Sequence, residues 1–133
     1  MKYLLDTNIC IYIINKRPSS IIDVIRLKKI NEISISPITI AELYYGAEKS
    51  QYPDQNRAAI LEFVIPFKIL NFDYRSAFCY GTIRERLESQ DIPIGPMDLL
   101  LAAQALAYDL IFVTNNVKEF KRIDKLRLEN WLM

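Results

Sequence analysis

Histidine is absent from this chain of 133 residues. Its absence excludes Ser-His-Asp and Cys-His catalysis, imidazole acid–base chemistry and histidine-ligated zinc. Any chemistry that the chain performs must therefore use carboxylates, hydroxyls, lysine, arginine or a metal ion held by oxygen atoms.

Glycine and cysteine are also scarce. None of the three glycines forms a GxGxxG or GxxxxGK phosphate-binding pattern. The two cysteines, Cys10 and Cys79, lie in apolar surroundings, and neither belongs to a CxxC pair. We therefore expect two reduced, buried thiols rather than a metal or redox site.

Long apolar runs are missing, since no run approaches the roughly 20 residues of a membrane span. Asp6 interrupts the apolar region that a signal peptide would need, so we expect a cytoplasmic protein without a membrane segment. The net charge is only +1, although basic residues gather in 16–29 and 118–127. A solvated helix or loop face is the simplest explanation for such runs.

The apolar segments alternate between short β-type runs and longer helical ones, which predicts an α/β fold with a central, mostly parallel, short-stranded sheet. We expect one domain over residues 1–133. Strands are predicted at 2–5, 32–35, 68–72, 110–114 and about 126–128. Helices are predicted at 8–15, 19–29, 37–49, 55–64, 73–90 and 96–107. We expect Thr7 or Asn8 to cap the first helix and Ser36 to cap the third, and we expect Asp54 to start the fourth.

Four carboxylates stand where the pattern otherwise predicts buried or apolar surroundings. Asp6 follows the first strand, and Glu119 lies just after the Thr-Asn-Asn sequence 114–116 that ends the fourth strand. Glu42 interrupts an apolar helix, and Asp98 lies in the first turn of another. Ligands of open parallel sheets bind outside the carboxyl ends of the strands, where Asp6 and residues 114–116 are expected.

Each acid alone has an ordinary explanation. Asp6 could cap the next helix, Asp98 could favour a helix N-terminus, Glu42 could reach solvent, and Glu119 could belong to a charged turn. Together they would repel one another and raise one another's pKa values, a conflict that a divalent cation removes. Mg²⁺ or Mn²⁺ prefers such oxygen ligands, and a metal-activated water suits phosphodiester hydrolysis.

Four sequence blocks carry a resemblance to a known family. They are LLDTNICIYII, SPITIAELYYGAEKS, IPIGPMDLLLAAQA and VTNNVKEF, and they occur in this order along essentially the whole chain. With an acid in each block, the chain resembles a PIN-domain ribonuclease, and more closely a VapC-type toxin of bacterial toxin–antitoxin modules. The resemblance implies a PIN-like α/β/α sandwich and a Mg²⁺- or Mn²⁺-dependent endoribonuclease.

The resemblance also implies roles for individual residues. The family's metal-binding acids fall on Asp6, Glu42 and Asp98. A fourth acid in many relatives lies near the positions of Asn116 and Glu119; here Asn116 is an amide, and Glu119 is the nearest acid. The hydroxyls of Thr7 and Thr114 and the side chain of Asn116 are candidates for orienting ligands or water.

Partners follow from the same resemblance. A VapC-type toxin pairs with a small VapB-type antitoxin, contacts operator DNA only through it, and is usually a homodimer. The implied substrate is structured RNA, with tRNA and the anticodon stem–loop of initiator tRNA as the favoured targets. The basic segments could then contact phosphates. Four tyrosines could serve as antitoxin anchors or pack in the core: Tyr12, Tyr44, Tyr45 and Tyr52.

Three other interpretations compete. A phosphoacceptor receiver domain needs an acidic pair after its first strand, but Asp6 is single. An aspartyl-phosphate phosphatase needs a second aspartate where this chain has Asn8. A catalytically weak interaction module, acting mainly as an antitoxin-binding co-repressor, is favoured by the amide at Asn116 and disfavoured by the four acids.

Overall fold

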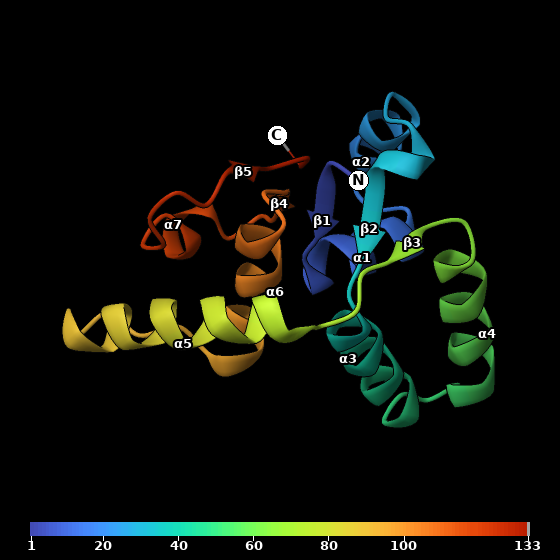
Figure 1. The fold of residues 1–133 in the computed structure, drawn as a ribbon. Helices are drawn as coiled ribbons and strands as arrows, with labels where there is room; N and C mark the ends of the chain where they lie inside the picture. Colours follow the sequence, from blue (N-terminus) through green and yellow to red (C-terminus); the bar gives the residue numbers. More distant parts are fainter. Residues whose placement is uncertain (133) are drawn as a thin grey trace.

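Five parallel strands form the centre of the molecule, in the spatial order β3-β2-β1-β4-β5 (Figure 1). The computed structural model describes residues 1–132. All four strand pairings are parallel, which confirms the predicted α/β class. The strands are β1 (Tyr3–Leu5), β2 (Ile33–Ile35), β3 (Lys68–Ile69), β4 (Ile111–Val113) and β5 (Leu128–Glu129).

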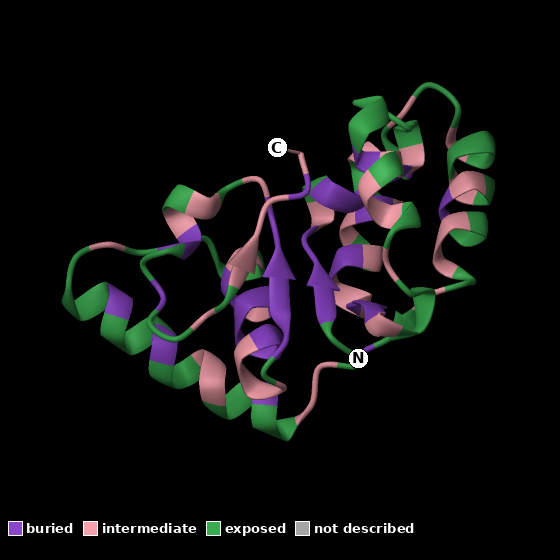
Figure 2. Cartoon of the chain, turned by 90° about the horizontal axis from the view of Figure 1, so that it is seen from above, coloured by how far each residue is buried: buried purple, intermediate pink, exposed green. Residues whose placement is uncertain are grey.

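Helices cover both faces of this sheet. Because side chains alternate along a strand, Tyr3 and Leu5 enter one apolar core, and Leu4 enters the other. Figure 2 shows the buried strands between half-buried helices on either side. The helices are α1 (Thr7–Asn15), α2 (Ser19–Arg26), α3 (Pro37–Glu48), α4 (Pro53–Val64), α5 (Tyr74–Ser89), α6 (Pro96–Ala107) and α7 (Val117–Phe120), with a 3₁₀ turn at Ile30–Glu32.

The first core lies mainly under α1 to α4, and the second lies mainly under α5, α6 and α7. In the second core, Phe112 of β4 meets Phe120 of α7 edge to face, with 4.8 Å between ring centroids. This contact holds the short α7 beside the end of β4. The result is the predicted α/β/α sandwich.

Local capping explains where several helices begin. The Ser36 hydroxyl accepts a hydrogen bond from the backbone N–H of Ile38, and Pro37 occupies the first helical position, as predicted. Asp73 caps α5 by accepting hydrogen bonds from the N–H and the hydroxyl of Ser76. The pKa of this carboxyl is lowered, mainly by the hydrogen bond from the Ser76 N–H. The helix predicted at 96–107 is confirmed at both ends.

Several predicted boundaries were wrong. The N-cap of α1 is Asp6, which the sequence allowed as an alternative, rather than Thr7 or Asn8, because Thr7 already has helical geometry and donates its N–H to the Asp6 carboxylate. The second helix ends at Arg26, three residues early, and a turn leads into the 3₁₀ segment. The fourth helix begins at Pro53 rather than at residue 55, since proline suits its first turn, and Asp54 lies inside that turn.

The outer strands were also misplaced. The strand predicted at 68–72 is shorter in the structure, where β3 spans only Lys68 and Ile69. It is an edge strand that pairs with β2 alone, and one further hydrogen bond to β2 runs from the Leu70 N–H to the Ile35 carbonyl. The last strand lies at 128–129 rather than 126–128, and the helix α7 was not predicted. Cys10 is buried as expected, but Cys79 is only half-buried on α5.

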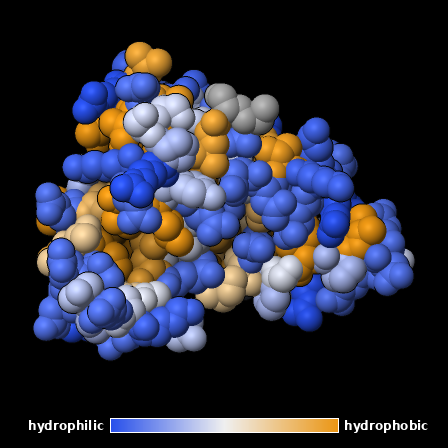
Figure 3. Space-filling view, turned by 180° about the vertical axis from the view of Figure 1, so that it is seen from behind, coloured by the Kyte–Doolittle hydropathy of each residue, from blue (hydrophilic) through white to orange (hydrophobic). Residues whose placement is uncertain are grey.

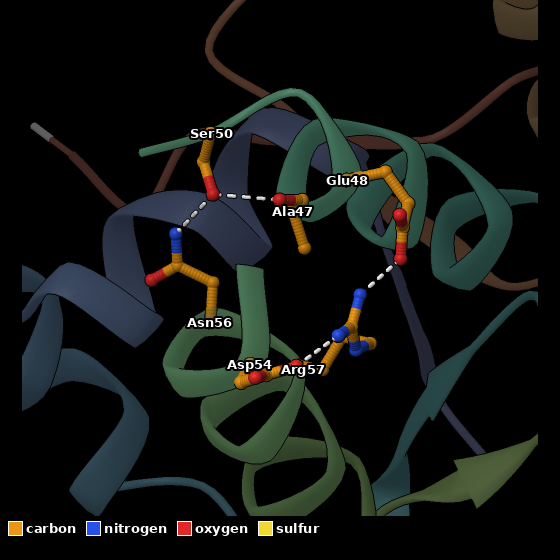
Figure 4. A network of polar contacts seen from close by, with 6 residues as sticks. All are labelled: Ala47, Glu48, Ser50, Asp54, Asn56 and Arg57. Carbon is orange, nitrogen blue, oxygen red and sulfur yellow. Dashed lines mark hydrogen bonds and ion pairs between the residues drawn. The ribbon is translucent and has the colours of Figure 1, made fainter. Parts of the chain in front are cut away.

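Polar contacts fasten the corner between α3 and α4 (Figure 4). The Arg57 guanidinium of α4 pairs with Glu48 of α3 and with Asp54 of its own helix. The Asn56 amide donates to the Ser50 hydroxyl, which in turn donates to the Ala47 carbonyl. None of the helices formed by residues 1–132 combines the length and the apolar character needed to cross a membrane.

Candidate active site

The candidate site lies where the direction of chain winding changes. From β1 the chain moves to β2 and β3 on one side of the sheet, and later to β4 and β5 on the other. The carboxyl ends of β1 and β4 therefore flank the topological switch point, where ligands of open α/β sheets bind. Asp6 directly follows β1, and Thr114 directly follows β4.

Asp6 is fixed by two hydrogen bonds and is only 4% exposed. Its Oδ1 accepts from the backbone N–H of Thr7 at 2.8 Å, and its Oδ2 accepts from the Thr114 hydroxyl at 2.8 Å. Burial raises the pKa of this carboxyl, the two hydrogen bonds partly offset that rise, and the charges of Glu42 and Glu119 add to it. The Asp6 side chain thus caps α1 and also lies in a buried position near other negative charges.

Glu42 reaches the same region from α3. Its Oε1 accepts a hydrogen bond of 2.6 Å from the hydroxyl of Thr7, the first residue of α1. Thr7 therefore holds two acids at once, Asp6 through its backbone amide and Glu42 through its side chain. The side chain of Glu42 is half-buried rather than directed freely into solvent.

Asp98 lies in the first turn of α6, where it is half-buried. Burial and the negative charges of Asp6, Glu119 and Glu42, in this order of size, raise its pKa to about 6. An ordinary helix N-terminus would lower the pKa of an aspartate instead. The charges of Glu42 and Glu119 thus act on both Asp6 and Asp98, which places the two aspartates in one negatively charged region.

The region after β4 contains the two candidates for the fourth position of the site, Glu119 and Asn116, and they differ in their surroundings. Glu119 is a half-buried residue of α7, and its charge acts on both Asp6 and Asp98. The side chain of Asn116 is exposed, and it is the backbone N–H of this residue that donates to the Thr114 hydroxyl, at 3.0 Å. The effect of its charge on the pKa values of Asp6 and Asp98 therefore favours Glu119 over Asn116 as the fourth member of the site.

Comparison with known proteins identifies the family of the chain. The profile of the PIN domain matches residues 3–126. Ribonuclease VapC2 of Rickettsia felis is 47% identical over 132 residues, covering 98% of each chain. The chain belongs to the PIN-domain family, in its VapC ribonuclease group. The tRNA(fMet)-specific endonuclease VapC of Shigella flexneri is 44% identical over 131 residues, again covering 98% of each chain.

Solved structures of the VapC group share the whole architecture. VapBC2 from Rickettsia felis, bound to a DNA fragment from its promoter, matches 98% of this chain and 99% of that chain, with a TM-score of 0.90 and 45% identity. DNA-bound VapBC from Salmonella typhimurium matches 98% of each chain, with a TM-score of 0.93 and 40% identity. Membership of this group also removes the receiver-domain and phosphatase interpretations.

The donor set of this PIN-domain chain fits a hard divalent cation. Within residues 1–132, no group of three or more aspartate, glutamate or cysteine side chains lies close enough together to hold a metal ion. Mg²⁺ does not require such a group, because it usually keeps several waters and binds through one or two carboxylates. Asp6 and Asp98 could serve as such ligands, since each carboxylate oxygen has a second lone pair beyond any hydrogen bond shown here.

Sequence reasoning missed two contributors to this VapC-group site. Thr39 is fully buried on α3, and its hydroxyl lies 3.1 Å from that of Thr7. A buried threonine one helical turn before Glu42, on the same face of the helix, was the available signal. The Asn115 amide donates to the Tyr12 hydroxyl at 3.3 Å and so links the end of β4 to α1, for which no sequence signal existed.

Proposed function

We propose that the chain is a Mg²⁺- or Mn²⁺-dependent endoribonuclease toxin of a type II toxin–antitoxin module. The carrying observation is the raised pKa of both Asp6 and Asp98 through burial and the charges of neighbouring acids at the β1/β4 switch point. Such a cluster costs stability unless it serves a bound cation. The names of the relatives support RNA as the substrate.

Asp6, Asp98, Glu42 and Glu119 would hold the ion, directly or through its waters. When bound, the ion activates a water molecule and stabilises the charge that develops on the phosphate. The chain contributes orientation: Thr114 fixes Asp6, and Thr7 fixes both Asp6 and Glu42. Asp98 is mainly ionised above a pH of about 6, so it is available as a ligand at neutral pH.

The proposed substrate is a tRNA, with the anticodon stem–loop of initiator tRNA as the favoured target. Two curated relatives bear the name tRNA(fMet)-specific endonuclease. The exposed Lys118 and Lys121 flank Glu119 and are suited to phosphate contacts.

Other basic residues of the two segments already have intramolecular partners. Arg127 pairs with Asp109, Arg122 donates to the Pro93 carbonyl, and the Lys28 ammonium lies 5.1 Å from the Tyr3 ring centroid. These three side chains are less available to RNA.

A VapB-type antitoxin is the proposed partner, and it would bring the operator DNA to the complex. A groove of about 220 Å³ between α1, α3 and α4 opens beside Glu42 and is lined by apolar residues including Ile11, Leu43 and Ile60. A second groove of about 430 Å³ separates α4 from α1 and α2. Figure 3 shows apolar side chains gathered on this side of the molecule.

The tyrosines divide between core and surface. Tyr12 and Tyr44 pack against the first core, whereas Tyr45 and Tyr52 are 66% and 60% exposed. Only the last two are therefore available as anchors for an antitoxin or for a second copy of the chain in the proposed homodimer.

The deciding experiment is cleavage of total bacterial tRNA by the purified, antitoxin-free chain. Reactions contain Mg²⁺, Mn²⁺ or EDTA, with Asp6→Ala and Asp98→Ala proteins as controls. A discrete cut that requires both the metal and the two aspartates is the expected result, and sequencing of the fragment ends identifies the target. Absence of any metal-dependent cut by the folded wild-type protein would favour the interaction module that acts as co-repressor.

A further inference from the structure

Thr39 is the inner end of a row of three polar side chains. Its hydroxyl is fully buried and lies 3.1 Å from the Thr7 hydroxyl, which lies 2.6 Å from Glu42 Oε1. The row starts inside α3, crosses to the first turn of α1 and returns to α3 one turn further on. It therefore fastens the two helices to each other beside the site.

The direction of these hydrogen bonds follows from the number of protons. Glu42 as a carboxylate can only accept, so the Thr7 hydroxyl must give it its single proton. The oxygen of Thr7 is then left as an acceptor toward Thr39, and Thr39 must donate. Each bond polarises the next one, so the donation to Glu42 is strengthened by the donation behind it.

We infer that Thr39 is a positioning residue, which fixes the Glu42 carboxylate in the site by acting through the Thr7 hydroxyl. This inference rests on the proposed ribonuclease function. Without the Thr39 donor, the Thr7 hydroxyl is free to rotate toward other acceptors, and Glu42 loses its single side-chain hydrogen bond within residues 1–132. The second carboxylate oxygen, Oε2, would no longer be presented in one orientation.

Packing alone does not require a hydroxyl at this position. Valine has nearly the same shape as threonine, and a buried hydroxyl costs free energy unless it is hydrogen-bonded. Thr39 has its side-chain partner in Thr7, which itself belongs to the site. A Thr39→Val protein should therefore fold at least as well as the wild type while it loses the orientation of Glu42.

The first test compares tRNA cleavage by the wild-type, Thr39→Val and Thr39→Ser proteins. We expect Thr39→Val to lower kcat by about three- to tenfold, the equivalent of one hydrogen bond, with little change in KM. Thr39→Ser keeps the donor and should restore most of kcat. Thr82→Val, an exposed change on α5, is the matched control. A loss of kcat in the serine protein that equals or exceeds the loss in the valine protein would overturn the inference, because the hydroxyl would then not be the feature that matters.

The second test asks whether Thr39 acts through Thr7. In a Thr7→Val background the middle hydroxyl is gone, so adding Thr39→Val should change kcat by less than about twofold. The same three- to tenfold loss in both backgrounds would show that Thr39 works by another route and would overturn the inference.

Crystal structures separate this inference from the proposed function. If the wild-type chain cuts no RNA, the proposed function fails, and the position of Glu42 in the wild-type and Thr39→Val structures decides the inference on its own. A displaced or disordered Glu42 carboxylate in the valine protein is the expected result. A carboxylate that stays on the Thr7 hydroxyl would overturn the inference.

Discussion

The Thr114 hydroxyl donates a hydrogen bond of 2.8 Å to Asp6 Oδ2, although 108 residues separate the two in sequence. The Thr114 oxygen in turn accepts from the backbone N–H of Asn116. Because Asp6 also caps α1, one carboxylate joins the start of the chain to its last quarter. This contact forms at the switch point of the sheet, where rigid strand ends position both partners.

Thr114→Val removes the donor to Asp6 with almost no change in side-chain volume. We expect kcat for RNA cleavage to fall by about tenfold, and the pKa of Asp6 to rise, because this hydrogen bond opposes the effect of burial. The pH–rate profile should shift toward higher pH in the valine protein. Thr114→Ser is the control, and a profile that is identical for wild type and valine protein would contradict the prediction.

Asp98→Asn removes one of the mutually repelling charges. We expect no detectable metal-dependent cleavage, together with a higher melting temperature than wild type in metal-free buffer at pH 7.5. The gain arises because the ionised Asp98 is destabilised by burial and by Asp6, Glu119 and Glu42. Differential scanning calorimetry measures it, and the exposed Asp124→Asn should leave the melting temperature unchanged.

The stability of the metal-free protein should depend on pH through Asp98. Its pKa is about 6 in the folded chain against 3.8 as the ordinary value, so the folded state binds the proton more tightly. The stabilising contribution is therefore fully present below a pH of about 4, and it is lost as the pH rises through about 6. Urea unfolding between pH 4 and 7 measures this decline.

Asp98→Asn is the matched control for this pH series. The variant should lack the Asp98 part of the decline and show a flatter profile. An unchanged profile in the variant would assign the pH dependence to other groups and would contradict the prediction.

Metal ions should stabilise the folded chain by mass action. At 100 times the dissociation constant, the free energy of unfolding rises by about 2.7 kcal/mol. We expect Mg²⁺ and Mn²⁺ to raise the melting temperature and EDTA to reverse the change. The Asp6→Asn/Asp98→Asn double variant should not respond, and a wild-type protein that ignores millimolar metal would argue strongly against the acidic pocket.

Glu119 and Asn116 make separable contributions. Glu119→Gln should reduce cleavage and lower the pKa of Asp98, because it removes one of the charges that raise that pKa. Asn116→Ala should have little effect, because it is the backbone N–H of Asn116 that contacts Thr114. Cleavage rates against pH for both variants check this, and the reverse order of effects would assign the fourth position to Asn116.

The fold class and the long helices were predictable because their signals are local. Pro96 at the start of α6 and Ser36 before α3 mark helix starts regardless of tertiary context. The start of α1 was not predictable in this way, since Asp6, Thr7 and Asn8 can all cap a helix. Only the position of Asp6 at the end of β1 selects it.

The supporting parts of the site depended on tertiary contacts. Asp6, Glu42, Asp98 and Glu119 were identifiable as acids out of place, but their hydrogen-bond partners were not all visible. The spacing of three residues places Thr39 on the same face of α3 as Glu42, but only the contact with Thr7 shows that Thr39 belongs to the site. The edge strand β3 and the four-residue α7 carry too few residues for a periodic signal.

The parallel order of the sheet also has a consequence for synthesis. β4 lies next to β1 in the middle of the sheet, yet it is the fourth strand to be made, and Glu119 follows it. A nascent chain therefore exposes an unpaired edge of β1 and an incomplete set of acids until most of its length has been translated. A fragment that ends before β4 lacks both the strand that pairs with this edge of β1 and the acid Glu119, so it cannot assemble the candidate site.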